Sequence, residues 1–581
     1  MPRTLISLMS MFLAGLSMTT ATASGADPTD DYIKAYLAMF PSRATAAGLY
    51  STDSRLERLD RDHRENWIAF NKTTRIALQE ALAEEPEAAL RLDRELLLRQ
   101  VQQELLEWRD QDRPRTDPLF WAEILGQSTV YLALRRDRPA VTRLSFAADR
   151  TDQIPRLVAE ALQAMAGTAD DQVIPERAQA ATERLRALAE FYRSGLPAAE
   201  GATRALARRL QRSGAKAADA IARLAARTEQ MAATAHADFR LGTDYDERFR
   251  IVTGIDRPVS QVLAEALREL ADKRQEAAAY GRGVWPQFYP EQKMPLDDSA
   301  VLRHLFAAIE AARPNSTAEL VAQFSADTDA AFAFAQSHEL MSVPEPRTLV
   351  IDTAPAWLGG QSVGGVYPAG PFQPDAETLF LLPNIPDSAP DEAKARFFSA
   401  FNTAFNRMIL THELVPGHYV QLKVAARLPH PVRSLFGDGV YTEGWGSFSE
   451  RLMLDLGWSG PPERLAHYKK QLENLARLIA DISVHTRHWD QARLQRFLTE
   501  DALLDAQFAS NLWQRAVLSS PQLTTYHLGY RDIHSIWLDW RREYPERPLR
   551  EFVDGMLALG AVPVREYRAS LLKPADPHAA H

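Results

Sequence analysis

The chain has 581 residues, of which 46% are hydrophobic and 25% are charged, and its formal net charge is −9. This composition is typical of a soluble globular protein, and the negative charge argues against a nucleic-acid-binding protein, which would normally be basic. The chain contains no Cys, which excludes disulfide scaffolds, cysteine zinc fingers, iron–sulfur clusters and thiol nucleophiles. Any metal site must therefore consist of His and carboxylate side chains.

The first residues have the pattern of a secretory signal peptide. A basic start that ends in Arg3 precedes the apolar run Leu5–Met18 and the small residues Ala21-Thr22-Ala23. We expect cleavage after Ala23 and export, to the periplasm if the host has two membranes. The alternative is an uncleaved anchor helix, but the run is shorter than the ~20 residues that span a bilayer. No stable membrane insertion is expected, and no Cys is present to carry a lipid.

The first half of the mature chain has a helical pattern. From Asp30 to about Ala335, Ala, Leu, Glu and Arg dominate, and apolar residues recur three and four positions apart. The length allows either two or three domains or one large helical domain. We predict a mainly α protein with a helical scaffold over residues 24–340, a metal-site region over 341–573 and a polar tail over 574–581.

The pattern changes between Pro344 and Pro386. Arg347–Asp352 and Glu377–Leu382 have the composition of strands. The glycine-rich connection Trp357–Pro368 lacks the Gly-Lys-Ser/Thr ending of a phosphate loop, so we do not expect nucleotide binding. A single buried helix is predicted next, with a start at Ser388–Asp391 that resembles a capping box and an apolar face from Phe397 to Ile409.

Two imidazoles flank a carboxylate in the segment Thr411-His412-Glu413-Leu414-Val415-Pro416-Gly417-His418. In the usual zinc-peptidase pattern, His-Glu-x-x-His, the two His share one helical face. Here Pro416 takes the fourth position, and on an ideal helix His418 would lie roughly 120° from the face of His412. Because Pro416 has no N–H and Gly417 tolerates positive φ, we predict a kink or bulge at Val415–Gly417 that returns His418 toward His412. The alternative is a pair of histidines that only caps a helix end.

Two carboxylates follow within the segment Tyr441–Glu450. Glu443 and Glu450 are seven residues apart, so on a helix they share one face. This spacing suits a third metal ligand at Glu443 and, at Glu450, a carboxylate that orients a ligand.

At these residues the chain resembles a bacterial family, domain of unknown function 885, which carries His-Glu-x-x-Pro-Gly-His followed by a Glu-Gly-Trp segment. The resemblance covers nearly the whole mature chain. More distantly, the chain is similar to the gluzincin zinc peptidases, such as the thimet-type oligopeptidases and angiotensin-converting enzyme. Those enzymes bind zinc through two His of one helix and a Glu of the next. The resemblance implies a large helical gluzincin-like fold with a small β element beside the active site.

The resemblance also suggests roles for three further segments. In gluzincins a strand beside the metal helix binds the substrate backbone, so Glu377–Leu382 is a candidate substrate-aligning edge strand; the alternative is a small sheet that only packs on helices. Arg477, Asp481 and His485 are four residues apart on one helical face. The family has a similar series near its site, so we expect contact with the ligands or the substrate rather than an exposed ladder of ion pairs.

The chain matches the family again at Pro521, Gln522, Tyr526 and Gly529. In thimet-type enzymes a tyrosine near a glycine on a late helix stabilises the oxyanion, which makes Tyr526 the candidate here. Tyr530 lies one turn further on the same face, and a hydrogen-bonded core tyrosine is the favoured interpretation of it.

Together these features predict a secreted zinc metallopeptidase. His412, His418 and Glu443 would bind Zn²⁺ and leave a fourth position open, Glu413 would act as the general base, and the substrate would be a peptide. Two alternatives remain open: a catalytically inactive metal-site protein that binds peptides, and a helical envelope scaffold without metal. The pattern predicts neither a substrate length nor an oligomeric state.

Overall fold

The structure is a computed structural model that describes residues 27–84, 87–355, 365–386 and 388–572. The predicted signal peptide, the polar tail and most of the glycine-rich connection lie outside the described residues. The described residues are 72% helical and include one small sheet, so the predicted mainly α fold is confirmed. None of the described helices is long and apolar enough to cross a membrane.

The helices of the first half are α1 Pro28–Met39, α2 Pro41–Ala46, α3 Arg61–Ala83, α4 Ala88–Leu105, α5 Arg113–Thr116, α6 Pro118–Gln127, α7 Val130–Leu134, α8 Ala140–Thr151, α9 Ile154–Ala164, α10 Pro175–Glu190, α11 Arg204–Thr234, α12 Tyr245–Thr253, α13 Val259–Phe288, α14 Asp298–Ala311 and α15 Thr317–Ser337. The second half contains α16 Asp391–Ala400, α17 Thr403–Glu413, α18 His418–Ala425, α19 Val432–Leu435, α20 Gly439–Asp455, α21 Pro461–Thr486, α22 Gln491–Arg496, α23 Ala506–Ser519, α24 Thr525–Glu543, α25 Leu549–Ala558 and α26 Val564–Leu571. The strands are β1 Leu349–Thr353, β2 Gly365–Tyr367 and β3 Thr378–Leu382.

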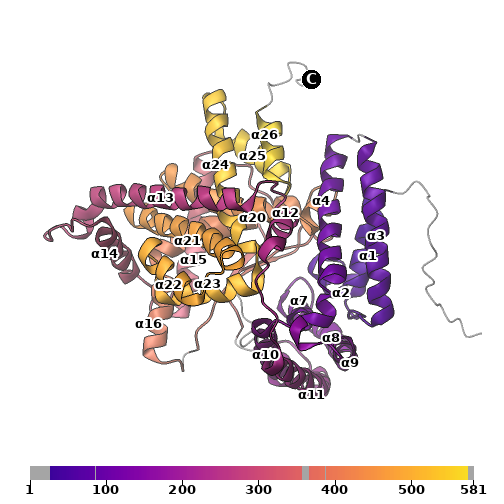
Figure 1. Cartoon of the computed structure of the whole chain (residues 1–581). Coiled ribbons are helices and arrows are strands. Elements are labelled where there is room, and N and C mark those ends of the chain that lie inside the picture. Colours follow the sequence, from indigo (N-terminus) through magenta and orange to yellow (C-terminus); the bar gives the residue numbers. More distant parts are fainter. Residues whose placement is uncertain (1–26, 85–86, 356–364, 387, 573–581) are drawn as a thin grey trace, which may run out of the picture.

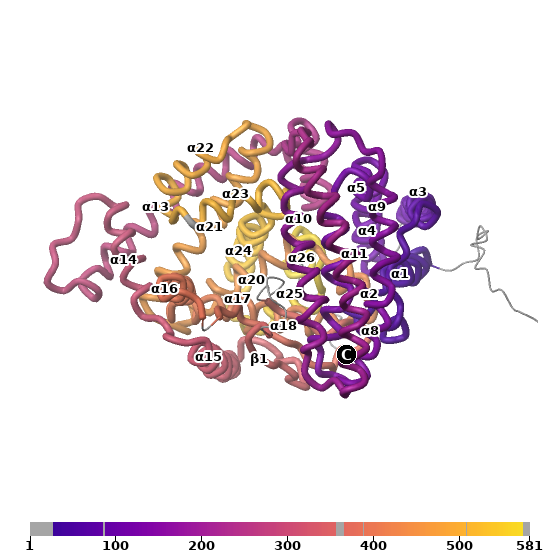
Figure 2. The backbone as a smooth tube through the Cα atoms, turned by 90° about the horizontal axis from the view of Figure 1, so that it is seen from below, coloured from indigo at the N-terminus to yellow at the C-terminus, as the bar shows by residue number. Residues whose placement is uncertain are grey.

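The helices that carry the site lie in the middle of the molecule. Figures 1 and 2 show α20, α21 and α24 there, with α13 along α21 and the helices α1–α11 gathered on one side. Helices α20 and α24 approach closely at two glycines, since a Cβ added to Gly444 would lie 2.4 Å from the carbonyl carbon of Gly529. The two glycines therefore allow the backbones of α20 and α24 to lie in direct contact.

The sheet corrects one prediction. Its strand order is β1-β3-β2, with β3 parallel to β1 and antiparallel to β2. All five residues of β3 are buried. The proposed edge strand, Glu377–Leu382, is therefore wrong: β3 occupies the centre, and both its edges are already paired. The sheet lies beside α18, since the Lys423 ammonium donates to the hydroxyl of Thr348 at 2.8 Å.

The predicted single helix before His412 is also wrong, because the structure has two. Helix α16 ends at Ala400 and α17 begins at Thr403. The side chain of Asn402 caps α17 by accepting a hydrogen bond from the N–H of Phe405 at 2.9 Å. An asparagine that caps the next helix competes with continuation of the previous one. The apolar pattern across Phe397–Ile409 hid this boundary.

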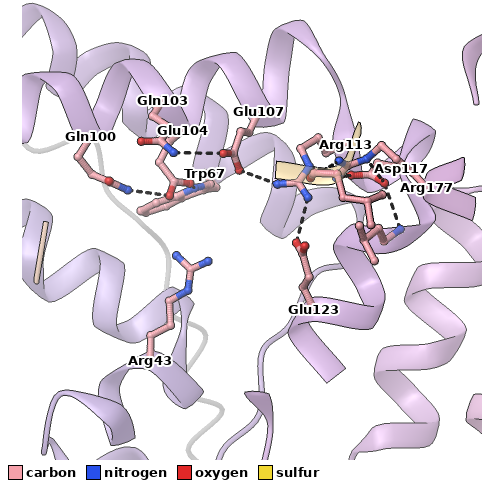
Figure 3. A network of polar contacts seen from close by, with 12 residues as sticks. Arg43, Trp67, Gln100, Gln103, Glu104, Glu107, Arg113, Asp117, Glu123 and Arg177 are labelled. Carbon is pink, nitrogen blue, oxygen red and sulfur yellow. Dashed lines mark hydrogen bonds and ion pairs between the residues drawn. The ribbon is translucent and has the colours of Figure 1, made fainter. Parts of the chain in front are cut away.

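A polar network joins the N-terminal helices to one another (Figure 3). The buried carboxyl of Glu104 on α4 accepts hydrogen bonds from the indole N–H of Trp67, at 2.8 Å, and from the amide of Gln100, at 3.0 Å. Glu107 lies one helical turn after Glu104 and accepts a hydrogen bond from the Arg113 guanidinium at 3.0 Å. The same guanidinium donates to Asp117 at 2.9 Å. This network ties α3, α4 and the α5–α6 corner together.

Candidate metal centre

The segment between His412 and His418 is a break between two helices. Helix α17 ends at Glu413, and α18 begins at His418. The indole N–H of Trp445 on α20 donates to the carbonyl oxygen of Pro416 at 2.9 Å. The predicted distortion at Val415–Gly417 is thus present as a complete interruption, and α20 holds it in place.

The interruption brings three predicted ligands together. The Nε2 atoms of His412 and His418 each lie 3.7 Å from Oε2 of Glu443, and one donor atom of each residue lies within 4.8 Å of the others. The two imidazole rings are 4.7 Å apart and nearly perpendicular, at 83°. An ion about 2.1 Å from each donor would separate tetrahedral ligands by ~3.4 Å. The two His–Glu distances of 3.7 Å are close to this value and suit a zinc-sized ion.

Hydrogen bonds fix the orientation of both imidazoles. The Nδ1–H of His412 donates to Oε1 of the fully buried Glu450 at 2.9 Å. The Nδ1 of His418 lies 3.3 Å from Oε1 of Gln421, one turn further along α18. A carboxylate only accepts hydrogen bonds, so Nδ1 of His412 carries a proton, and Nε2 is the nitrogen that faces Glu443. Such outer partners are typical of metal-binding histidines.

Two glycines make room for this arrangement. A Cβ on Gly446 would lie 2.7 Å from Cε1 of His412, and a Cβ on Gly417 would lie 1.8 Å from the carbonyl oxygen of His412. Gly417 has a φ of −67°, so the expectation that it serves by adopting positive φ is wrong. The glycine is needed because its Cα lies against the backbone at the end of α17.

The charges of the site are strongly coupled. Burial by itself would lower the pKa of His412, but the carboxylates of Glu443 and Glu450 outweigh burial and raise the pKa to about 9. Burial would raise the pKa of Glu443, and its contacts with His412 and His418 instead hold that pKa well below the ordinary range. The metal-free site therefore holds a proton that a cation would displace.

Glu413 directly follows His412 at the end of α17 and is only partly buried. Its negative charge contributes to the raised pKa of His412, so the two side chains are close. Within the described residues its carboxylate takes part in no hydrogen bond or ion pair. An uncommitted carboxylate beside a candidate ligand is free to accept a proton.

The hydroxyl of Tyr526 has neighbours that make it a donor. Oε1 of Gln522 accepts a hydrogen bond from the Arg515 guanidinium at 2.9 Å, which turns the amide N–H of Gln522 toward Tyr526 at 3.2 Å. Arg515 itself lies 3.5 Å from the same hydroxyl. Because the Tyr526 oxygen accepts from both neighbours, its own proton is available to a ligand.

One known family matches most of the length of this chain. The sequence pattern of the family described as "Bacterial protein of unknown function (DUF885)" matches residues 41–571. The chain belongs to this family. No curated protein matches it. A "putative lipoprotein of unknown function" from Shewanella oneidensis has the same fold, with a TM-score of 0.76 and 22% identity over 95% of this chain and 100% of that one.

A second structure with the same fold is that of a "putative lipoprotein" from Colwellia psychrerythraea. It has a TM-score of 0.76 and 15% identity, and the match covers 94% of this chain and 98% of that one. At these identities the two structures show the fold of this DUF885 chain and say nothing of its chemistry.

The predicted series on α21, Arg477, Asp481 and His485, lies in two different environments in this DUF885 protein. The Arg477 guanidinium lies 5.2 Å from the centre of the Tyr526 ring. Asp481 instead accepts hydrogen bonds from the hydroxyls of Tyr245, at 2.7 Å, and Ser520, at 2.6 Å. His485 bonds the backbone, with Nε2 2.9 Å from the carbonyl oxygen of Ala516. Asp481 thus holds the loop that leads to Tyr526, while Arg477 touches Tyr526 itself.

Tyr530 is buried in the core, and burial raises its pKa to about 12. Its ring lies 6.5 Å from that of His467, whose Nδ1 is 3.0 Å from Oε2 of Glu450. Both oxygens of Glu450 are therefore held by histidines, His412 on one side and His467 on the other.

Sequence reasoning missed His467 and Gln421. Gln421 lies three residues after His418, a spacing that places it one helical turn away. His467 lies ten residues before Arg477, and helical spacings of three and four connect them on one face of α21. Extending the Arg477 face backwards would have found His467.

Proposed function

We propose that this protein is a zinc-dependent peptidase that hydrolyses peptide bonds of oligopeptides. The observation that carries the proposal is the convergence of His412, His418 and Glu443 on one point, with the uncommitted carboxylate of Glu413 beside them. Three borderline nitrogen and oxygen donors without Cys suit zinc better than calcium or magnesium, which prefer oxygen ligands.

A bound zinc ion would supply Lewis-acid chemistry that polarises the substrate carbonyl and favours deprotonation of water. Glu413 would take a proton from the attacking water as the new C–O bond forms. It would then give that proton to the amine nitrogen as the C–N bond breaks. Tyr526 would donate a hydrogen bond from its hydroxyl to the carbonyl oxygen while that oxygen carries negative charge. Such a hydrogen bond is worth about 3–4 kcal/mol in other hydrolases. Glu450 would keep the His412 ring in place throughout.

We further propose that the protein is exported and that the segment up to Ala23 is removed. The N-terminal pattern supports this, and the two solved structures with the same fold are each named a "putative lipoprotein". This chain has no Cys, so we propose a protein that is free in the periplasm rather than lipid-anchored.

Elemental analysis of the purified protein, combined with digestion of a peptide library, tests the proposal. One zinc per chain with cleaved peptides supports it. Zinc without cleavage favours the inactive peptide-binding alternative, and a metal-free protein favours the helical scaffold.

A further inference from the structure

Helix α11 carries a row of basic side chains along one face. Its 31 residues include seven basic and only two acidic side chains, in a chain whose net charge is −9. One of the seven, Arg209, is paired with Asp149 at 2.8 Å and with Asp152 at 2.7 Å. The other six form what we call the basic stripe: Arg204, Arg208, Arg212, Lys216, Arg223 and Arg227. At ~100° per residue, these six positions fall within an arc of about 140° around the helix.

The basic stripe lies on the outside of the molecule. Arg227 is partly exposed, and the other five side chains are exposed. Helix α11 lies at the lower edge of the molecule in Figure 1 and faces the viewer in Figure 2. Its opposite side is apolar and buried, with Leu210, Ile221 and Leu224 in the core. The stripe therefore presents one face, ~35 Å long from Arg204 to Arg227, to whatever lies against α11.

No described residue neutralises the basic stripe. None of its six side chains takes part in an ion pair or a hydrogen bond with any described residue. The two acidic residues of α11 are already paired with arginines that precede the helix. Arg193 lies 2.9 Å from Asp219, and Arg186 lies 2.7 Å from Glu229. Six positive charges thus remain uncompensated on one face of an acidic protein.

The placement of these charges costs the helix stability. The first four cations follow one another at intervals of four residues, and like charges at this spacing destabilise a helix. Arg204 is also the first residue of α11, where the helix dipole favours anions over cations. Four residues rise ~6 Å, which is shorter than the Debye length of ~8 Å at physiological ionic strength, so neighbouring cations act together. An anionic partner would remove both penalties.

We infer that the basic stripe binds the surface of a membrane that contains anionic phospholipid, such as phosphatidylglycerol. This role requires the proposed export but no peptidase activity, because an exported protein meets phospholipid membranes rather than nucleic acid. Each Lys or Arg near an anionic bilayer raises the affinity roughly fivefold. A bilayer is flat over the length of one helix, so all six cations reach it together. Alanine is the only apolar residue on the same arc of α11, so attachment is electrostatic and reversible, without insertion.

Flotation of the mature protein with lipid vesicles tests this assignment. One vesicle set contains phosphatidylethanolamine and phosphatidylglycerol at about 3:1, which gives the negative surface potential that attracts cations, and the other contains only phosphatidylcholine. We expect binding to the anionic set alone, and a fall of about tenfold or more when the salt is raised from ~0.05 M to ~0.5 M, because the Debye length shortens. Equal binding to both sets, binding to neither set, or binding that ignores salt would each overturn the assignment.

Variants locate the surface on α11. The combined replacement Arg208→Gln, Arg212→Gln and Lys216→Gln should lower partition into anionic vesicles about 100-fold, at roughly fivefold per cation. Arg208→Lys with Arg212→Lys keeps both charges and should retain binding. Circular dichroism verifies that each variant is folded.

A matched control removes three exposed and unpaired cations from three other helices, α3, α13 and α22. It combines Lys72→Gln, Arg268→Gln and Arg496→Gln, changes the net charge equally, and should bind vesicles like the wild type. Equal losses in the two triple variants would overturn the assignment to α11, because net charge alone would then explain the binding.

Two further measurements address other partners. Binding to a short DNA duplex that is as tight as binding to anionic vesicles, at the same salt, would indicate general attraction to polyanions and overturn the membrane assignment. Dimerisation in sedimentation velocity that the α11 triple variant abolishes would instead assign the stripe to a second copy of this acidic chain. Because partition is measured without substrate, a protein that binds vesicles but cleaves no peptide contradicts only the proposed peptidase. A protein that cleaves peptides but binds no vesicles contradicts only the membrane assignment.

Discussion

His412 and Glu450 are joined by a hydrogen bond of 2.9 Å between the imidazole Nδ1 and a carboxylate oxygen that is completely buried. The second oxygen of Glu450 bonds His467 at 3.0 Å. The helices α17, α20 and α21 thus meet at one carboxylate directly behind the candidate ligand. This contact fixes which nitrogen of His412 faces the metal centre.

Glu450→Gln should therefore weaken zinc binding without removing a ligand. Loss of an outer partner typically costs 10–100-fold in metal affinity, and we expect a loss in that range by competition with a chromogenic chelator. Replacement of the ligand itself, in Glu443→Gln or His418→Ala, should cost more. Tight zinc binding at full occupancy in His418→Ala would show that His418 is not a ligand.

Glu413→Gln should separate the enzyme from the binding protein. The variant keeps every candidate ligand, so zinc content and thermal unfolding should match the wild type. Hydrolysis should fall by at least ~10²-fold, as is typical when a general base is removed. Assays use a peptide that the wild type demonstrably cleaves, and near-wild-type turnover would refute the proposed mechanism. Glu450 is no substitute base, because both its oxygens are engaged by histidines.

Gly446→Ala should disturb the metal centre by displacing the His412 ring. The added methyl group would lie 2.7 Å from the His412 ring, and the ring must move because buried side chains have no room to spare. We expect weaker zinc binding together with a destabilisation of about 1–3 kcal/mol. Gly439→Ala is the matched control, since a Cβ at this position of the same helix has no atom within 4 Å. Equal zinc affinity in both variants would contradict the arrangement.

The buried carboxyl of Glu104 should make stability depend on pH. Burial is the main reason that its pKa rises from 4.5 to about 7. As pH increases from 4.5 to 7, Glu104 ionises first in the unfolded chain, so the folded state loses relative stability. The loss should reach about 3 kcal/mol, at 1.4 kcal/mol per pKa unit.

Urea unfolding between pH 4.5 and 8, with a chelator present, measures this dependence. Glu104→Gln keeps the shape of the side chain and should flatten the curve in that window. Identical pH dependence of the variant and the wild type would show that Glu104 ionises normally in the folded protein.

Much of the fold followed from local pattern. The helical class, two of the three strands and the interruption after Glu413 were predictable, because apolar periodicity and a proline act over a few residues. The boundary at Asn402 was hidden by the apolar pattern around it, although the cap on Phe405 is local. The central place of β3 was not predictable, because it depends on partners elsewhere in the chain, such as the Cα pairing of Phe380 with Ile351 on one side and Val366 on the other.

By itself the sequence determined which side chains were available for chemistry: no Cys, His412 and His418 around a helix breaker, and carboxylates at a helical spacing of seven. Only the tertiary structure decided where their atoms point. The close contact of Gly446 with the His412 ring and the anchoring of Pro416 by α20 set the angle between three helices. Such contacts join residues tens of positions apart, and their register depends on packing, which no local pattern contains. For the same reason, only the structure shows that His467 bonds the second oxygen of Glu450.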